Sequence, residues 1–466
     1  MKRKASRGKR IKVKHGEGGK LFVNRPSVAG IDLGSLEHYV ACPQKIEGEA
    51  NVRVFGTTTP QLEALSDWLK AEGVESVAME STGVYWIPLF EILDQRGIEV
   101  ILADARQIKH VPGRKTDMID CQWLQLLHSC GLLRGAFRPA DGFCRLRSVI
   151  RQRETLTGEQ ADWLRRMQKS LDQMNIRVHR AVSDISGVTG MAIIRAIVGG
   201  ERDPYTLAGL RNNRCRKSVD QIAEELTGNW REDHLFNLEE ALRMYEFILE
   251  RIQVYDTEIQ RILRELSPGD QHEPVPEVTK ASKKKMMKAR GQEPLRKALY
   301  RVCGCDLTSI DGINVTTTEI VLSELGTDLS CFPTEGHFIS FLRLSPKLAI
   351  SGGKPIRKRP KGTATTRVGA ALRMSALTLR NSKTALGGYY RRISRRKGAG
   401  VAVFATARKL AIHIYRLLRY GVAYVDAGLE AYEQRFQQAR LKMAHQIANQ
   451  FGYKIIKHDE LQTTVS

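Results

Sequence analysis

The chain has 466 residues, 42% of them hydrophobic and 7% aromatic, which is enough for folded cores and excludes a disordered tail protein. Lys and Arg number 74 against 51 Asp and Glu, and the net charge of +23 favours a nucleic acid partner over a generally adhesive or ribosome-associated basic protein. Eight scattered cysteines and no apolar run long enough to span a bilayer exclude a disulfide scaffold and a membrane protein, and indicate a cytoplasmic one.

The chain begins with a basic segment, which we expect to be a flexible arm over residues 1–26. Residues 1–20 carry nine Lys or Arg and one Glu, a composition too polar to fold alone. Two interpretations stay open: the arm contacts a nucleic acid backbone, or it only keeps the chain solvated.

An α/β domain is expected over residues 27–145. Apolar runs predict strands at 28–32, 38–42, 52–55, 74–80 and 98–102, and periodic apolar positions predict helices at 59–70, 85–95 and 117–130. Three strands, a helix, and then alternating strand and helix are the order of a ribonuclease H-like domain. A doubly wound nucleotide-binding fold would alternate from the start and carry a Gly-rich phosphate loop, which this stretch lacks.

Acidic residues of this domain have the positions of a metal-binding set. Asp32 and Glu80 each end an apolar run that predicts a strand. Asp117 and Asp120 are three residues apart, the spacing of neighbours on one helix face. Each acid alone is an ordinary turn or surface residue, but together they are hard oxygen ligands and predict a site for Mg²⁺ or Mn²⁺. Zinc is not expected, because the cysteines include no Cys-x-x-Cys pair.

The middle of the chain, residues 146–266, is predicted as a helical coiled-coil region with an insert. Apolar side chains alternate steps of three and four in two seams: Leu164, Met167, Leu171, Met174 and Val178, then Leu238, Leu242, Tyr245, Leu249, Ile252, Tyr255 and Ile259. Three interpretations stay open: the two seams pair with each other as a hairpin, they pair with another subunit, or they pack in a plain helical core. Turns at 200–204 and Gly228 mark the smaller insert, and residues 267–294, rich in Pro, Lys and Glu, are predicted as a linker.

A mainly helical domain is predicted over residues 295–455, followed by a polar tail at 456–466. Residues 307–325 resemble a helix-hairpin-helix, whose tight turn would aim backbone N–H groups at a phosphate. Further on, Ser351 is followed by two glycines. A Ser-Gly-Gly segment is ordinarily a flexible turn; here it could also bring a hydroxyl nucleophile to a backbone phosphate, activated by the metal site of the other domain.

Several residues are candidate nucleic-acid contacts because they adjoin the predicted acids, hairpin or serine. They are Arg114, Lys115, Gly312, Lys354, Arg357, Lys358 and Arg359. The four basic residues after Ser351 would lower the charge barrier that a nucleophile meets at a phosphate.

Taken together, these motifs resemble one family, the insertion-sequence 110 family of transposases, also called bridge-RNA-guided DEDD recombinases. The motifs that carry the resemblance lie at residues 30–32, 79–86, 115–120, 200–204 and 350–353. The resemblance covers nearly the whole chain after the basic arm, and the set in this order is specific.

The resemblance implies an N-terminal RuvC-like (ribonuclease H-like) domain, a coiled-coil segment and a C-terminal transposase domain. It implies a metal site formed by Asp32, Glu80, Asp117 and Asp120, and a nucleophilic Ser351 that becomes covalently joined to the cut DNA strand. It also implies a nucleoid-associated homo-oligomer, a dimer or tetramer, in which one subunit's acids meet another subunit's serine. A structured noncoding guide RNA would pair with donor and target DNA, so base pairing would choose the sequence.

Two positions depart from the family pattern. Asn314 stands where the family more often has a second glycine; asparagine tolerates left-handed backbone, so we expect the turn to survive. Arg343 is the first residue of a four-residue segment, 343–346, that more usually reads Gly-Leu-x-Pro in the family. The same segment contains Ser345, which is a second candidate for the nucleophile beside Ser351.

Three hypotheses follow. The first is a recombinase that cuts and rejoins DNA by Mg²⁺-assisted transesterification through a phosphoserine. The second is a RuvC-like, metal-dependent junction-resolving nuclease that activates water, with Ser351 only a turn residue. The third is a non-catalytic RNA-binding scaffold whose carboxylates are structural. The chemistry of the cut ends separates the first two, and absence of cutting with any divalent ion would favour the third.

Overall fold

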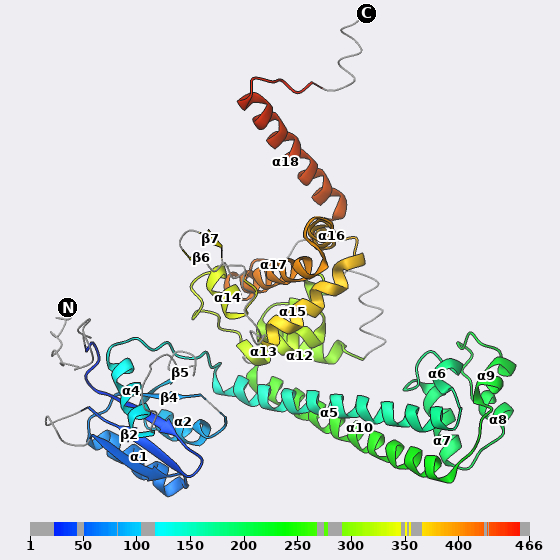
Figure 1. Ribbon diagram of the computed structural model, residues 1–466, viewed down its shortest axis with the longest axis horizontal. Coiled ribbons are helices and arrows are strands. Elements are labelled where there is room, and N and C mark those ends of the chain that lie inside the picture. Colours follow the sequence, from blue (N-terminus) through cyan, green and yellow to red (C-terminus); the bar gives the residue numbers. More distant parts are fainter. Residues whose placement is uncertain are drawn as a thin grey trace, which may run out of the picture. The chain divides into compact units, whose positions relative to one another are not determined.

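The computed structural model describes residues 23–43, 51–81, 83–103, 117–267, 275–277, 291–345, 350–351, 354–355, 366–423, 426 and 428–456. The chain divides into two compact units, Met1–Arg138 and Pro139–Ser466. Figure 1 labels the helices and strands of each unit. The predicted arm at 1–26 and the predicted linker at 267–294 lie mostly outside the described residues.

The N-terminal unit is built on a mixed five-stranded sheet in the order β3-β2-β1-β4-β5. The strands are β1 (Val28–Leu33), β2 (Glu37–Ala41), β3 (Val52–Gly56), β4 (Ser76–Glu80) and β5 (Glu99–Ala103). β1, β2 and β3 pair antiparallel, while β4 is parallel to both β1 and β5. Hairpin connections allow the first pairings, and helical crossovers are needed for the parallel ones. This topology fits the predicted ribonuclease H-like domain.

Helices cover both faces of this sheet. α1 (Thr59–Ala71) and α2 (Trp86–Gln95) share a buried cluster with Ile31 and Met79, while Ala78 clusters with Leu124 of α4 (Asp117–Ser129). Because successive side chains of a strand point to opposite faces, α4 lies on the face opposite α1 and α2. The predicted elements agree with these bounds to within about two residues, as expected where a strong apolar period sets them.

The packing of α4 on the sheet depends on Gly30, in the middle of β1. A Cβ atom at Gly30 would lie 2.3 Å from the carbonyl oxygen of Cys121 and 2.3 Å from the amide nitrogen of Gln125. Both are backbone atoms of α4, so neither can turn aside as a side chain would. The helix backbone therefore rests directly on β1, and only glycine permits this distance.

We predict that Gly30→Ala destabilises the N-terminal unit by about 1–3 kcal/mol, because the added methyl must push α4 off the sheet. Denaturant unfolding of the full chain measures this as a lower midpoint. Gly158→Ala is the matched control: its Cβ would meet nothing within 4 Å, and alanine there should stabilise helix α5 by roughly 0.5–1 kcal/mol. Equal midpoints for Gly30→Ala and the unchanged chain would contradict the prediction.

The C-terminal unit begins with two long helices, α5 (Asp141–Gln173) and α10 (Glu232–Leu266), that lie side by side (Figure 1). Leu146 near the start of α5 clusters with Ile262 near the end of α10, so the helices run antiparallel as a hairpin. Four short helices cap the far end: α6 (Val178–Ala181), α7 (Val188–Val198), α8 (Pro204–Gly209) and α9 (Val219–Leu226). These form the predicted insert, which we call the hairpin tip.

The hairpin corrects parts of the two predicted seams. α5 ends at Gln173, and Asn175 has a left-handed backbone with φ 56°, so Val178 belongs to the core of the tip and not to a continuing seam. On α10, Leu249 is 37% exposed while Ile248 is buried, so Leu249 was wrong as a packing position. The structure shows a helical hairpin, and a coiled coil stays a prediction.

The base of the hairpin packs against the helices that follow it. Ile150 of α5 and Ile259 of α10 share a core with Leu299 and Leu322. The remaining elements are α12 (Glu293–Cys303), η1 (Leu307–Ser309), α13 (Val315–Leu325), α14 (Glu335–Phe341), β6 (Ile350–Ser351), β7 (Lys354–Pro355), α15 (Arg367–Thr378), η2 (Leu379–Asn381), α16 (Ala385–Lys397), α17 (Ala399–Tyr420) and α18 (Leu429–Gln450). This region is mainly helical, as predicted. None of the helices in the described ranges is long and apolar enough to cross a membrane.

Candidate nucleic-acid-processing site

Two predicted site residues end adjacent parallel strands. β1 and β4 pair with Ile31 opposite Met79, so Asp32 and Glu80 are the next residues on each strand, about one strand spacing of 4.8 Å apart. Both acids are half-buried. Side chains alternate between faces, and Gly30 faces α4; Asp32, two residues on, therefore projects to the same face, and Glu80 follows Ala78 in the same way.

A third predicted acid, Asp120, lies on the helix that covers this face. It is half-buried and sits one turn before Leu124, which packs against Ala78. Burial is the main cause that raises the pKa of the neighbouring Cys121 thiol to about 12, and the charges of Asp32 and Asp120 contribute to this rise. The backbone of Cys121 lies against Gly30, two residues before Asp32, so α4 with Asp120 covers the face of the sheet to which Asp32 projects.

Asp117 is the first residue of α4, one turn before Asp120, and its side chain is outside the described part of the chain. Arg114 and Lys115 precede the described start of α4 and are outside it too. Among side chains within the described ranges, no three from His, Cys, Asp and Glu form a group that could hold a metal ion.

The donor chemistry of this face nevertheless fits a hard divalent cation. The acids supply carboxylate oxygens, which Mg²⁺ and Mn²⁺ prefer, and neighbouring carboxylates repel one another unless a cation lies between them. The predicted ligands of such an ion therefore stay Asp32, Glu80, Asp120 and Asp117.

Ser351 occupies a short antiparallel ribbon. It ends β6 and pairs with Lys354, the first residue of β7, while Ile350 pairs with Pro355. Its backbone is thus part of a strand ladder, although the ordinary interpretation of Ser-Gly-Gly was a flexible turn. The side chains of Ser351 and Lys354 are not described, and Arg357, Lys358 and Arg359 lie beyond the described residues.

The segment predicted as a helix-hairpin-helix contains a tight, packed turn between the short η1 and α13, and the motif itself stays a prediction. Gly312 has φ +84°, and a Cβ there would lie 3.1 Å from Cδ1 of Leu379 and from the carbonyl oxygen of Ser375. Asn314 is extended, with φ −109°, and its side chain accepts a hydrogen bond of 2.7 Å from the amide of Thr317. The turn is present, but the left-handed backbone expected at Asn314 was wrong: the asparagine is extended and caps α13 instead. A phosphate contact at Gly312 stays a prediction.

Comparison with known protein families decides the identity. Residues 29–176 match a family model for a DEDD-type transposase, and residues 304–391 match a model described as "Transposase IS116/IS110/IS902 family". The chain belongs to the IS110 family of transposases. No curated protein matches it. The predicted acids fall within the first match, and Gly312 and Ser351 fall within the second.

Membership makes the chain an enzyme, a transposase that recombines DNA, and DNA is therefore its substrate. A DEDD transposase domain also indicates dependence on a divalent metal. The sequence-based predictions gave no role to Gly30 or Cys121, whose backbones meet where α4 packs on β1. The signal that could have identified Gly30 is a lone glycine inside an apolar strand, because such a glycine marks a close backbone approach.

Arg343 explains one departure of this transposase from its family pattern. The amides of Arg343 and Leu344 donate to the carbonyls of Ser340 and Ile339, 3.0 Å each, which closes α14 as a Schellman motif. Arg343 occupies the position that needs left-handed backbone, with φ 58°, and glycine is favoured there. The rival hydroxyl of Ser345 lies 3.2 Å from that of Ser340.

We predict that Arg343→Gly stabilises this transposase by about 0.5–1 kcal/mol, because left-handed backbone costs a non-glycine residue roughly 1 kcal/mol. The free energy of unfolding measures the effect. Arg343→Ala is the control, since it removes the guanidinium but keeps the Cβ that causes the strain. Equal stabilisation by both substitutions would assign the gain to the lost charge and contradict the backbone explanation.

Proposed function

We propose that this transposase cuts and rejoins DNA strands by transesterification through a covalent phosphoserine at Ser351, assisted by Mg²⁺ or Mn²⁺. The observation that supports the proposal is geometric: Asp32 and Glu80 end adjacent parallel strands, on the sheet face that α4 with Asp120 covers. The residues that would hold the ion are Asp32, Glu80, Asp117 and Asp120.

When bound, a divalent cation stabilises negative charge on the entering and leaving oxygens of a phosphoryl transfer. The protein's own residues position the reaction. Gly30 allows α4, the helix that carries Asp120, to pack directly on β1. The β6–β7 pairing fixes the backbone of Ser351, and Lys354 next to it would reduce the charge of the attacked phosphate.

The covalent step balances without an external energy source. The Ser351 oxygen forms a bond to phosphorus and gives up its proton, while the bond from that phosphorus to the leaving deoxyribose oxygen breaks and that oxygen takes up a proton. Rejoining reverses these changes with the hydroxyl of another strand. Each phosphodiester that is cut is thus conserved as a phosphoserine ester until it is exchanged.

Guidance by a structured noncoding RNA and assembly as a homo-oligomer, a dimer or tetramer, are part of the proposal. One subunit's acids would meet the serine of another, and the RNA would pair with donor and target DNA at the nucleoid. The net charge of +23 supports binding of two polyanions. Candidate backbone contacts are Arg114, Lys115, Gly312, Lys354, Arg357, Lys358 and Arg359.

Ser351→Ala is expected to abolish covalent protein–DNA adducts, because no hydroxyl remains to bond phosphorus, while RNA and DNA binding stay within about twofold. Denaturing gel electrophoresis of end-labelled DNA after incubation with Mg²⁺ detects the adduct. Ser345→Ala is the matched control and should retain it. Adducts that persist in Ser351→Ala would remove its role, and cut ends that carry only free phosphate would favour a junction-resolving nuclease.

Asp117→Asn is expected to reduce strand cutting at least about 10²-fold, because a neutral amide no longer attracts the cation that the carboxylates hold. Initial cleavage rates over a Mg²⁺ titration measure this. Asp94→Asn, an exposed acid of α2, is the control and should cut at the normal rate. Full activity of Asp117→Asn would exclude Asp117 from the metal site.

A further inference from the structure

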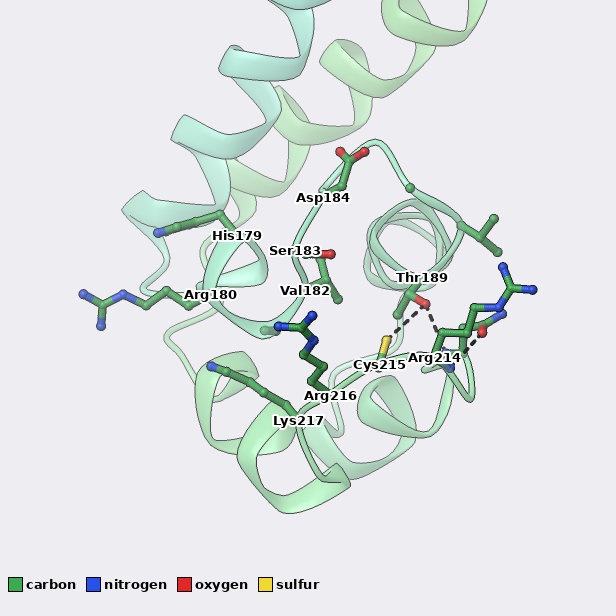
Figure 2. Close-up of a pocket in the computed structure, with 14 residues that line it drawn as sticks. His179, Arg180, Val182, Ser183, Asp184, Thr189, Arg214, Cys215, Arg216 and Lys217 are labelled. Carbon is green, nitrogen blue, oxygen red and sulfur yellow. Dashed lines mark hydrogen bonds between the residues drawn. The ribbon is translucent and has the colours of Figure 1, made fainter. Parts of the chain in front are cut away.

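A cavity of about 760 Å³ lies in the hairpin tip, far along the chain from the predicted acids and serine. Its walls come from α6 with the turn that follows it, from the first residues of α7, and from the loop 211–217 between α8 and α9. Figure 2 shows Arg180 and Lys217 extending to one side of this cavity and Arg214 to the other, with Arg216 between them. The volume falls in the range of sites that bind nucleotide-sized ligands.

The charge of the cavity wall is predominantly positive. Within the described residues, no ion pair joins Arg180, Arg214 or Arg216 to a carboxylate. Lys217, by contrast, is paired with Glu225 at 3.1 Å. Asp184 also lines the cavity and contributes a negative charge, while its carboxylate accepts hydrogen bonds from the amide and hydroxyl of Ser186, at 2.9 and 2.7 Å. Three guanidinium groups against this one carboxylate leave the wall with a net positive charge that attracts an anion.

The arginine-bearing loop is held in place before any ligand binds. The amide of Asn212 donates to the hydroxyl of Thr189 on α7 at 3.1 Å, and the Arg211 guanidinium donates to the carbonyl of Lys217 at 2.6 Å. Within the loop, the amide of Arg214 donates to the side-chain oxygen of Asn212 at 3.0 Å. A fixed loop backbone reduces the ordering cost of binding, as a dedicated site requires.

We propose that this cavity binds the phosphodiester backbone of a nucleic acid strand. Guanidinium groups bind phosphate oxygens in bidentate geometry and are weakly hydrated, so arginines spaced around an open cavity suit successive phosphates better than one small anion. Val188 and Thr189, in the first turn of α7, also line the cavity, and the helix dipole adds partial positive charge there.

The cavity at the tip lies far from the helices at the base of the hairpin. α5 has 33 residues, so at 1.5 Å per residue the tip stands about 50 Å from the start of that helix, near which α12 and α13 pack. A strand held at the tip is therefore anchored far from the helices at the hairpin base. This inference rests on nucleic acid being the substrate class, and it is independent of the proposed chemistry at Ser351.

The test is a full-length variant carrying Arg180→Ala, Arg214→Ala and Arg216→Ala. Fluorescence anisotropy measures its binding to a labelled single-stranded RNA, an RNA hairpin and a DNA duplex over a series of KCl concentrations. We expect affinity for at least one probe to fall about tenfold or more. The slope of log K against log [KCl] should become shallower by about 0.7 per lost single-strand contact, or about 0.9 per duplex contact. The affected probe identifies the bound strand as RNA or DNA.

The control removes the same charge from the hairpin outside the cavity: Arg195→Ala, Arg243→Ala and Arg251→Ala, whose guanidinium groups pair with Glu246, Glu239 and Glu250. Equal affinities and equal salt slopes for the two triple variants, with every probe, would overturn the proposal. If the cavity triple variant has a lower melting temperature, single Arg214→Gln and Arg216→Gln variants replace it. Ser351→Ala should keep the full salt slope, so failure of the proposed cutting chemistry is distinguished from failure of this site.

Discussion

The direct contact between the backbone of α4 and β1 at Gly30 is the constraint on which the candidate site depends. With no side chain at Gly30, the carbonyl of Cys121 and the amide of Gln125 approach to distances that any Cβ would forbid. This contact packs α4, which carries Asp120, directly on the strand that carries Asp32, beside the strand that ends at Glu80. The proposed metal site needs this close packing, because a helix held further from the sheet would move Asp120 away from the strand acids.

The C-terminal unit depends on a second constraint, a buried charge network at the base of the hairpin. Arg153 of α5 contacts Asp256 of α10 at 2.7 Å and also pairs with Glu319 of α13, whose side chain is 1% exposed. Burial raises the pKa of Glu319, and the Arg153 charge opposes that rise. Because a buried carboxylate needs its partner, the network fixes the two hairpin helices against α13. The hairpin is therefore joined to the helices that follow it by both apolar packing and an ion-pair network, and it carries the arginine-lined cavity at its tip.

Some arginines of this chain are paired with glutamates, and others have no carboxylate partner within the described residues. Arg243 and Arg261 on α10 and Arg195 on α7 are paired with glutamates, which gives solvated helix faces of little net charge. The three arginines that line the cavity of the tip have no such partner within the described residues, and the segment after Ser351 is rich in Lys and Arg. An excess of charge that is concentrated at separate places suits a protein that holds nucleic acid at more than one point.

The sequence by itself determined the elements of the N-terminal unit, the helical nature of the middle region and the family, because apolar periods of 2 and 3.6 and ordered motifs are local properties. That the two long helices pair with each other as a hairpin was one of three open alternatives, and the structure decided it. It also identified the strand-end acids and the α4 pair. Tertiary packing decided the rest. Whether Ile248 or Leu249 is buried depends on the facing helix, and Asn314 caps α13 because of the turn that Gly312 makes against Leu379. The packing of α4, which carries Asp120, on the strand that carries Asp32, and the cavity that Arg180, Arg214 and Arg216 line together, join residues far apart in the chain, and no local pattern encodes such contacts.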